Sequence, residues 1–229
     1  QWPDFEELAR LLEGGVNVTN AGSQGIYVAD GDGDISDVMV NVAGSSGVQV
    51  SDGDLTLSEA TIGNVAGDAV YVSKGDALIS DLQVVDLSSA QDENSAVGSG
   101  VDVRGHALVT NTLIDKTEGY GLYAESAEVS YTSISNGQDR GVTIYGNSAS
   151  SITFSDITDN GSYGVVGVSK GTNGLQLSKS NITGNYEYGV YYVQLMDGCY
   201  VANNYNLTGV DTVSGGSIDG SFTTKGTQF

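Results

Sequence analysis

Asp102, Arg104 and His106 bring three chemically active side chains into one short segment: a carboxylate, a guanidinium and the only imidazole of the chain. Positioned side chains of these types can transfer protons, and a pair of carboxylates can cleave a glycosidic bond. The three residues follow the polar segment 88–99, which interrupts an otherwise regular sequence. We predict that this segment is the part of the chain best suited to catalysis; the alternative is that His106 is an ordinary surface residue.

Carboxylates also recur around three glycines, Gly31, Gly53 and Gly75. Like charges stacked about 5 Å apart repel each other unless a cation or water lies between them. Oxygen-rich loops suit Ca²⁺, although Ile35 stands where an EF-hand loop needs glycine. The sequence allows two interpretations of these loops: a solvated acidic edge, or a site for bound Ca²⁺. The candidate ligands are Asp30, Asp32, Asp34, Asp52, Asp54 and Asp76.

A third group is aromatic and lies beside regularly spaced glycines. One position directly precedes the glycine and another follows it by two residues, on the outer face of a predicted strand. A surface of this kind can stack sugar rings or contact a neighbouring subunit. The alternative is the ordinary preference of tyrosine for pleated sheets. The residues are Tyr120, Tyr123, Arg140, Tyr163, Tyr188 and Tyr191.

A repeat must position these candidate groups. An apolar residue is followed seven positions later by a small residue, as in Ile182 and Gly189. A spacing kept this strictly, while the rest of each unit varies, indicates a repeat protein. The small residue falls at Gly25, Gly47, Ala69, Gly100, Gly121, Gly141, Gly164 and Gly189.

Each unit contains three short runs of alternating apolar and polar residues, such as 48–50, 55–57 and 60–62. Alternation with a period of two indicates half-buried strands, and no run after residue 15 reaches helix length. Units of about 22 residues with three strands stack as turns of a parallel β-helix, because one turn cannot bury its apolar face alone. We therefore predict an all-β solenoid with three parallel sheets and about eight or nine turns.

The segments IDKTEGYGLYA (114–124), ITDNGSYGVVGV (157–168) and ITGNYEYGVYYV (182–193) resemble the right-handed parallel β-helix repeat family, the pectate-lyase-like superfold. The resemblance covers nearly all of the chain after residue 15. It implies a right-handed coil, with substrate on the outer face of the first sheet in lyase and hydrolase relatives. An arginine base with metal-bound carboxylates would indicate a lyase. The Asp-Asp and Gly-His-Gly signatures of polygalacturonases are absent, and one insertion alone is long enough to wall a cleft.

A column of hydroxyl groups follows the second strand of each unit. We predict a buried hydrogen-bond ladder at this bend, because a buried bend must satisfy its polar groups. The resemblance implies asparagine in such a ladder, so hydroxyl side chains depart from the family pattern. The column is Ser36, Ser58, Ser80, Thr110, Ser130, Thr153 and Ser178.

The two ends of the chain differ from the repeat. Asp4 and Glu7 have the spacing of a capping box, and Gly14 and Gly15 supply a stop, so residues 1–15 are predicted to form a short capping α-helix. The β-helix is predicted over 16–218, and 219–229 as a C-terminal end or tail.

Composition narrows the function. Eight Lys and Arg stand against 29 Asp and Glu, a formal charge of -21, so nucleic acid is excluded as a partner. No stretch approaches the roughly 20 apolar residues of a membrane span. The leading hypothesis is a non-catalytic, extracellular or cell-surface β-solenoid, a surface, adhesion or filament module stabilised by Ca²⁺. Its partners are other copies, packed end to end or laterally, or glycans. The alternative is a polysaccharide lyase or hydrolase, or a carbohydrate-binding β-helix, acting on acidic glycans.

Overall fold

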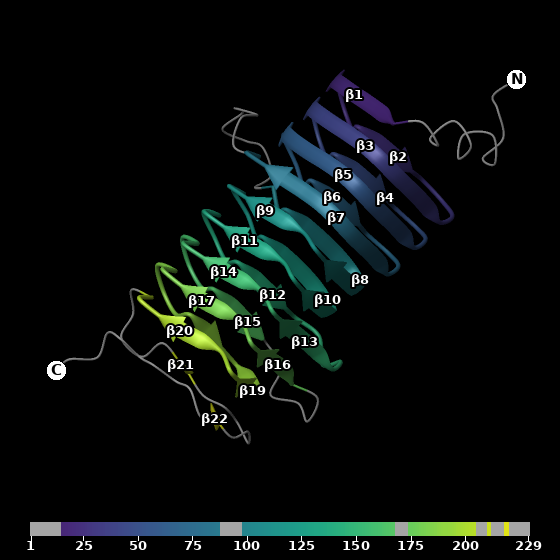
Figure 1. Ribbon diagram of the computed structural model, residues 1–229. Coiled ribbons are helices and arrows are strands. Elements are labelled where there is room, and N and C mark those ends of the chain that lie inside the picture. The colour runs from purple at the N-terminus through teal and green to yellow at the C-terminus, as the bar shows by residue number, and fades with distance from the viewer. Residues whose placement is uncertain (1–14, 88–97, 168–173, 205–209, 212–217, 220–229) are drawn as a thin grey trace, which may run out of the picture.

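The computed structural model describes residues 15–87, 98–167, 174–204, 210–211 and 218–219. Within these ranges the chain winds as an all-β solenoid, and each strand pairs in parallel with the equivalent strand one turn later (Figure 1). The solenoid has about eight turns, which confirms the predicted architecture. No helix in the described ranges is long and apolar enough to cross a membrane.

The first sheet carries the outer face on which the candidate residues were predicted. Its strands stack in register from Ile26 through Val48, Val70 and Val101 to the later turns. The strands are β2 (Ile26–Val28), β4 (Val48–Val50), β6 (Val70–Val72), the first part of β8 (Val101–Thr110) and of β10 (Leu122–Ser130), β12 (Val142–Ile144), β15 (Val165–Gly167), β18 (Val190–Tyr191) and β21 (Val210–Asp211).

The other two sheets share several long strands that run through a corner. The second sheet contains the first part of β3 (Gly33–Ala43), β5 (Leu55–Val65) and β7 (Ala77–Val85), the later part of β8 and β10, then β13 (Ser150–Thr153), β16 (Leu175–Ser178), β19 (Val193–Asp197) and β22 (Ile218–Asp219). The third contains β1 (Val16–Ala21), the later part of β3, β5 and β7, then β9 (Leu113–Asp115), β11 (Ser133–Ser135), β14 (Asp156–Thr158), β17 (Asn181–Thr183) and β20 (Tyr200–Ala202).

The core is built from files of branched aliphatic residues. The central inward position of the third sheet is at most 1 % exposed in every turn from Val40 to Ile182. Burying such a side chain stabilises the fold by about 1.5–3 kcal/mol. The file is Val40, Ile62, Val84, Ile114, Ile134, Ile157 and Ile182.

The spacing of seven residues reflects contact between this file and the predicted glycine positions. A Cβ atom at Gly121 would lie 2.2 Å from Ile134 Cγ2 of the next turn and 2.6 Å from the Gly141 carbonyl oxygen. Gly47 is placed in the same way against Ile62, at 2.5 Å. Glycine is therefore required where the backbone of one turn crosses the isoleucine of the next.

The predicted hydroxyl column is aligned in register, but its burial was predicted wrongly. Ser36 is exposed and Thr110 and Ser130 are half-buried, and the Ser130 hydroxyl donates to Thr110 Oγ1 at 3.2 Å. Each column residue is the last one in the second sheet before the corner, and alternation along the strand turns its side chain outward. The next residue is left-handed, as in Asn111 with φ of 49° and Tyr131 with φ of 50°, and this corner directs the following side chain inward.

The buried polar ladders lie beyond that corner. Hydroxyl groups two residues after the column each donate to the column residue's backbone carbonyl, at 2.8–3.0 Å. They belong to Thr112, Thr132, Ser155 and Ser180. A second ladder is the asparagine type that the resemblance implied. Asn160 Nδ2 donates to Asn185 Oδ1, and Asn185 Nδ2 to Asn204 Oδ1, both at 2.9 Å.

Two predictions fall largely outside the described residues. The capping helix over 1–15 is described only at Gly15, which has φ of +67° just before β1. The tail over 219–229 is described only at Asp219, the end of β22.

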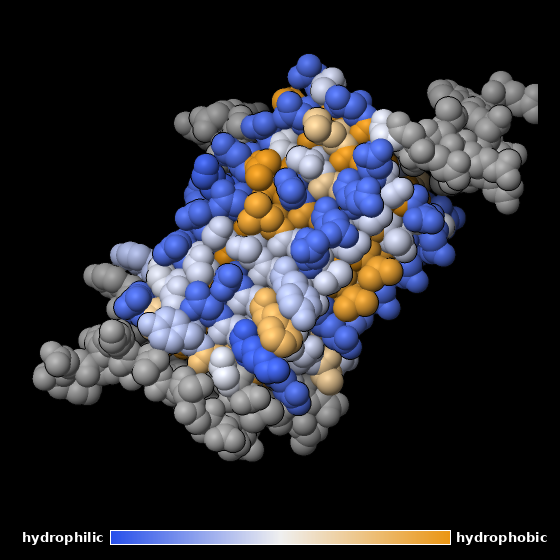
Figure 2. All heavy atoms as spheres, viewed as in Figure 1, coloured by the Kyte–Doolittle hydropathy of each residue, from blue (hydrophilic) through white to orange (hydrophobic). Residues whose placement is uncertain are grey.

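On the face shown in Figure 2, exposed apolar side chains form separate groups among hydrophilic ones.

Candidate functional site

Asp102 and Arg104 form an ion pair on the outer face of the first sheet. Asp102 pairs in register with Tyr71 of β6 and Tyr123 of β10, and only 7 % of its surface is exposed. Arg104 Nη2 donates to Asp102 Oδ2 at 2.8 Å, and the guanidinium carbon lies 4.9 Å from the centre of the Tyr123 ring. The Tyr145 hydroxyl donates to the Arg104 carbonyl oxygen at 3.1 Å. A carboxylate and an aromatic face thus both hold the arginine.

Asp68 is a second carboxyl group at this corner, and sequence reasoning missed it. Its Oδ1 accepts the backbone N–H of Ser99 at 2.7 Å. Burial raises the pKa of Asp68, and burial together with the charge of Asp68 raises the pKa of Asp102 to about 6, against the lowering effect of Arg104. Asp68 precedes Ala69 and so occupies the position that Tyr120 holds before its glycine, which is the signal that could have found it.

His106 makes other contacts. A hydrogen bond of 2.8 Å joins its Nδ1 to Ser126 Oγ, and its backbone N–H donates to Asp76 Oδ1 at 2.7 Å. Of the three candidate residues, the structure therefore joins Asp102 and Arg104, and Asp68 rather than His106 is the further ionisable group that acts on Asp102. The resulting corner has two carboxyl groups, but Asp102 is covered and bound to Arg104, so it does not present an open acid to a substrate.

The six predicted surface residues are brought together in one row. Tyr120 stacks on Tyr123 at 5.1 Å between ring centres, and Tyr163 stacks on Tyr188 at 5.4 Å. The Arg140 guanidinium carbon connects these pairs, 5.7 Å from the Tyr120 ring and 5.4 Å from the Tyr163 ring. We call the whole row the tyrosine–arginine strip, which comprises Arg104, Tyr120, Tyr123, Arg140, Tyr145, Tyr163, Tyr188 and Tyr191.

The way the rings stack decides what the strip can bind. Each stacked tyrosine has a face covered by its neighbour, so ring edges and hydroxyl groups remain for a ligand. Ring edges carry partial positive charge, and guanidinium and phenol groups donate hydrogen bonds. Arg140 Nε is buried with no hydrogen-bond partner among the described residues. The strip therefore suits an anionic ligand better than flat stacking on a neutral sugar ring.

Comparison with known proteins places the chain in a family. A family model described as the right handed beta helix region matches residues 15–206. The chain belongs to the right-handed beta helix family. This family includes pectate lyases, hydrolases and structural proteins, so membership establishes the fold and its hand but not a reaction. A search of curated proteins found no match to this β-helix.

The predicted calcium ligands line the first turns of the β-helix. Carboxylates of one column accept backbone N–H groups from the next turn: Asp32 from Asp54 at 2.9 Å, and Asp54 from Asp76 at 2.8 Å. Asp30 is exposed before this column, and Asp34 lies on the second sheet opposite Thr56.

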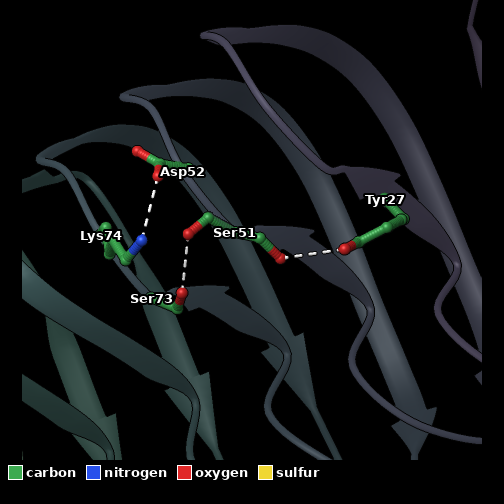
Figure 3. A network of polar contacts seen from close by, with 5 residues as sticks. All are labelled: Tyr27, Ser51, Asp52, Ser73 and Lys74. Carbon is green, nitrogen blue, oxygen red and sulfur yellow. Dashed lines mark hydrogen bonds and ion pairs between the residues drawn. The ribbon is translucent and has the colours of Figure 1, made fainter.

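Asp52 forms an ion pair of 3.0 Å with Lys74, as Figure 3 shows. Beside this pair the Ser73 hydroxyl donates to the Ser51 carbonyl oxygen at 2.7 Å, and Ser51 Oγ to the Tyr27 hydroxyl at 3.2 Å (Figure 3). Among the described residues no group of three or more acidic, histidine or cysteine side chains is arranged to hold a metal ion. The calcium site therefore stays a prediction.

Sequence reasoning also missed an aromatic corner between the second and third sheets. Tyr131 and Phe154 stack with rings 5.1 Å apart and are 62 % and 46 % exposed. Lys179 places its ammonium group 4.9 Å from the Phe154 ring. All three residues have φ near +50°, a conformation that bulky side chains rarely adopt.

Elsewhere a hollow of about 620 Å³ near Asn20 and Asn64 is lined by no titratable side chain.

Proposed function

We propose that this β-helix is a non-catalytic, extracellular adhesion module that binds acidic glycans along the tyrosine–arginine strip. The observation that carries the proposal is the pair of stacked tyrosine groups on the strip: Arg140 lies over one ring of each group, and Arg104 lies over Tyr123. Arg104 and Arg140 are two of the three arginines in a chain whose net charge is -21, and both lie on this strip. The two guanidinium groups can each form paired, charge-assisted hydrogen bonds with a carboxylate or a sulfate, which favours an anionic partner at this face.

A binding role fits this corner better than cleavage. Glycoside hydrolysis requires a carboxylic acid within hydrogen-bond reach of the scissile oxygen. Asp102 is 7 % exposed, and Arg104 occupies its Oδ2. Polysaccharide cleavage is the alternative function. We expect no new reducing ends or unsaturated sugars when the protein is incubated with acidic polysaccharides, and cleavage that Asp102→Asn abolishes would establish the alternative.

The binding proposal is tested with a pair of variants that remove the same charge from different faces. Arg140→Gln removes a guanidinium from the strip, whereas Lys179→Gln removes an ammonium from the aromatic corner. On an array of acidic and neutral glycans, followed by calorimetry, we expect Arg140→Gln to weaken binding of acidic glycans about tenfold, the loss of about one charge-assisted hydrogen bond. Lys179→Gln should bind as the wild type does. Equal affinities for all three proteins, or no acidic glycan bound by any of them, would overturn the proposal.

Two further predictions accompany this function. Calcium bound at the acidic turns would stabilise the folded state by an amount that grows with the logarithm of the Ca²⁺ concentration above the Kd. A rise in melting temperature at millimolar Ca²⁺ over the Ca²⁺-free protein measures it. Packing of copies end to end or laterally would produce particles whose size grows with concentration, and light scattering measures that growth.

A further inference from the structure

Arg104 lies between a buried carboxyl group and the surface. Its side chain is 44 % exposed, whereas that of Asp102 is 10 % exposed. Asp102 Oδ1 is buried and has no hydrogen-bond partner among the described residues. A buried carboxylate with one unsatisfied oxygen is costly to keep ionised, and a second carboxylate nearby adds to that cost. Asp68 supplies this second charge from the turn before β6.

We infer that Asp68 and Asp102 form a proton-controlled latch on Arg104, which releases the guanidinium to an anionic group of the ligand when Asp102 gains a proton. The inference rests on the proposed binding of acidic glycans, since it specifies how that site is regulated. With Asp102 ionised, the guanidinium is neutralised internally at 2.8 Å. A proton taken from solvent removes that charge, and the guanidinium is then free to bind a ligand anion over the Tyr123 ring.

The transition falls in a mildly acidic range. Burial raises the pKa of Asp102 to about 6, so the latch is closed at pH 8 and mostly open at pH 5. The other ionisable groups around Arg104 are Tyr71, Tyr123, Tyr145 and Glu125. His106 follows along β8 and bonds to Ser126. Because this imidazole belongs to the same strand as Arg104, the variant His106→Gln separates its contribution from that of Asp102.

The latch is first tested in the absence of ligand. Carbon NMR of the Asp68 and Asp102 carboxyl groups and nitrogen NMR of the Arg104 guanidinium are recorded from pH 4 to pH 8. We expect Asp102 to titrate with a midpoint near 6 and the Arg104 signals to change with the same midpoint. A midpoint near the ordinary value of an aspartate, or Arg104 signals that do not follow Asp102, would overturn the latch whatever the protein binds.

The second test measures binding. Dextran sulfate is the probe and dextran the neutral control, because sulfate esters keep their charge across this pH range. We expect wild-type protein to bind dextran sulfate about tenfold more tightly at pH 5 than at pH 8, which corresponds to one released guanidinium. Asp102→Asn should bind at pH 8 as the wild type does at pH 5. Arg104→Gln should bind weakly at both, and His106→Gln should retain the wild-type pH dependence.

The outcomes separate the two proposals. A pH dependence that survives in Asp102→Asn, or disappears in His106→Gln, shows that another group is responsible and the latch is wrong. If the NMR titration proceeds as expected but no variant binds dextran sulfate at any pH, the proposed function fails for polyanions and the latch has no ligand of this class to regulate. Binding that is strong at every pH and insensitive to Arg104→Gln overturns the latch and leaves the strip as the binding surface.

Discussion

The early and late turns of the β-helix share one core but differ in how they satisfy polar groups. In the early turns the carboxylates of Asp32 and Asp54, both exposed, accept backbone N–H groups from the next turn. In the late turns buried side chains such as Asn160 and Asn185 bond each other and the backbone within the solenoid. The early turns thus have a hydrated acidic edge, and the late turns have internal ladders with aromatic residues outside. The repeat therefore fixes the positions of the side chains, whereas the residue type in each column determines which contacts a turn can make.

Asp102 lies where the two patterns meet. In the two preceding turns the equivalent outward position of the first sheet is held by Gln49 and then Tyr71. In the next turn it is held by Tyr123. A charged residue in this column is covered by the aromatic residue and the arginine beside it, so its burial exceeds that of the aspartates in the early turns. The same residue type is therefore a hydrated edge group at Asp54 and a buried titratable group at Asp102.

The largest expected effect comes from disturbing what the two regions share. Gly121→Val would place a Cβ atom 2.2 Å from Ile134 Cγ2, and the backbone oxygen at 2.6 Å cannot move without displacing the next turn. Overpacking of this kind should lower the free energy of unfolding by about 3 kcal/mol. Denaturant unfolding followed by circular dichroism measures the loss.

A valine at Gly47 tests whether the two regions really share this scaffold, since its Cβ would lie 2.5 Å from Ile62 Cγ2. We expect a loss of similar size there. Gly22→Val is the matched control, because no atom lies within 4 Å of a Cβ atom at that position. A small loss at Gly47 beside a large one at Gly121 would mean that the early turns are packed more loosely than the late ones.

The next effect separates the regions. Asn185→Ala removes a fully buried amide that donates to Asn204 Oδ1 and accepts from Asn160 Nδ2, and it leaves buried groups unpaired on both neighbours. We expect a loss of about 2 kcal/mol, whereas Asp54→Ala should cost under about 1 kcal/mol because water replaces its contact. Thermal and denaturant unfolding of the two variants give the comparison. Equal losses would show that the acidic column is as structural as the asparagine ladder.

The sequence predicted the architecture well because the solenoid depends on local spacing. The step from Ile134 to Gly141 repeats a contact that the structure shows between each isoleucine and a glycine one turn earlier. The burial of the hydroxyl column at Ser130 was predicted wrongly because a left-handed residue, Tyr131 with φ of 50°, intervenes and reverses the direction of side chains. Alternation alone does not reveal such a corner, since tyrosine gives no signal for positive φ.

The candidate site was predictable in part. The strip was found because its tyrosines occupy fixed positions beside the repeat glycine. The electrostatic effect of Asp68 on Asp102 was not predicted, because the insertion 88–99 separates the two turns in sequence and obscures their alignment. His106 was a candidate by residue type alone, and its hydrogen-bond partner Ser126 was not predicted. Ser126 lies one turn further on, and only the register of β8 on β10 brings the two together.

The smallest expected effect distinguishes the buried aspartate at the boundary from the exposed ones. The fold raises the pKa of Asp102 from 3.8 to about 6, so the folded state binds more protons than the unfolded state between those values. Stability contributed at this residue is therefore present below about pH 4 and is lost as the pH rises to about 6. The pKa difference alone corresponds to about 3 kcal/mol of lost stability, which Asp102→Asn would recover. The same substitution removes the ion-pair partner of Arg104, so we expect the free energy of unfolding to rise by only about 1 kcal/mol at pH 7.

The measurement is the difference in unfolding free energy between Asp102→Asn and wild type from pH 4 to pH 8. This difference should grow between pH 4 and pH 6 and stay constant above, since Asp102 is then ionised in both the folded and the unfolded state. Asp156→Asn, at an exposed aspartate on the third sheet, is the control with which the profile of Asp102→Asn is compared. If Asp102→Asn gives a flat difference, the carboxyl group is hydrated as in the early turns. The boundary would then hold no buried acid, and the contrast between the two regions would reduce to their ladders.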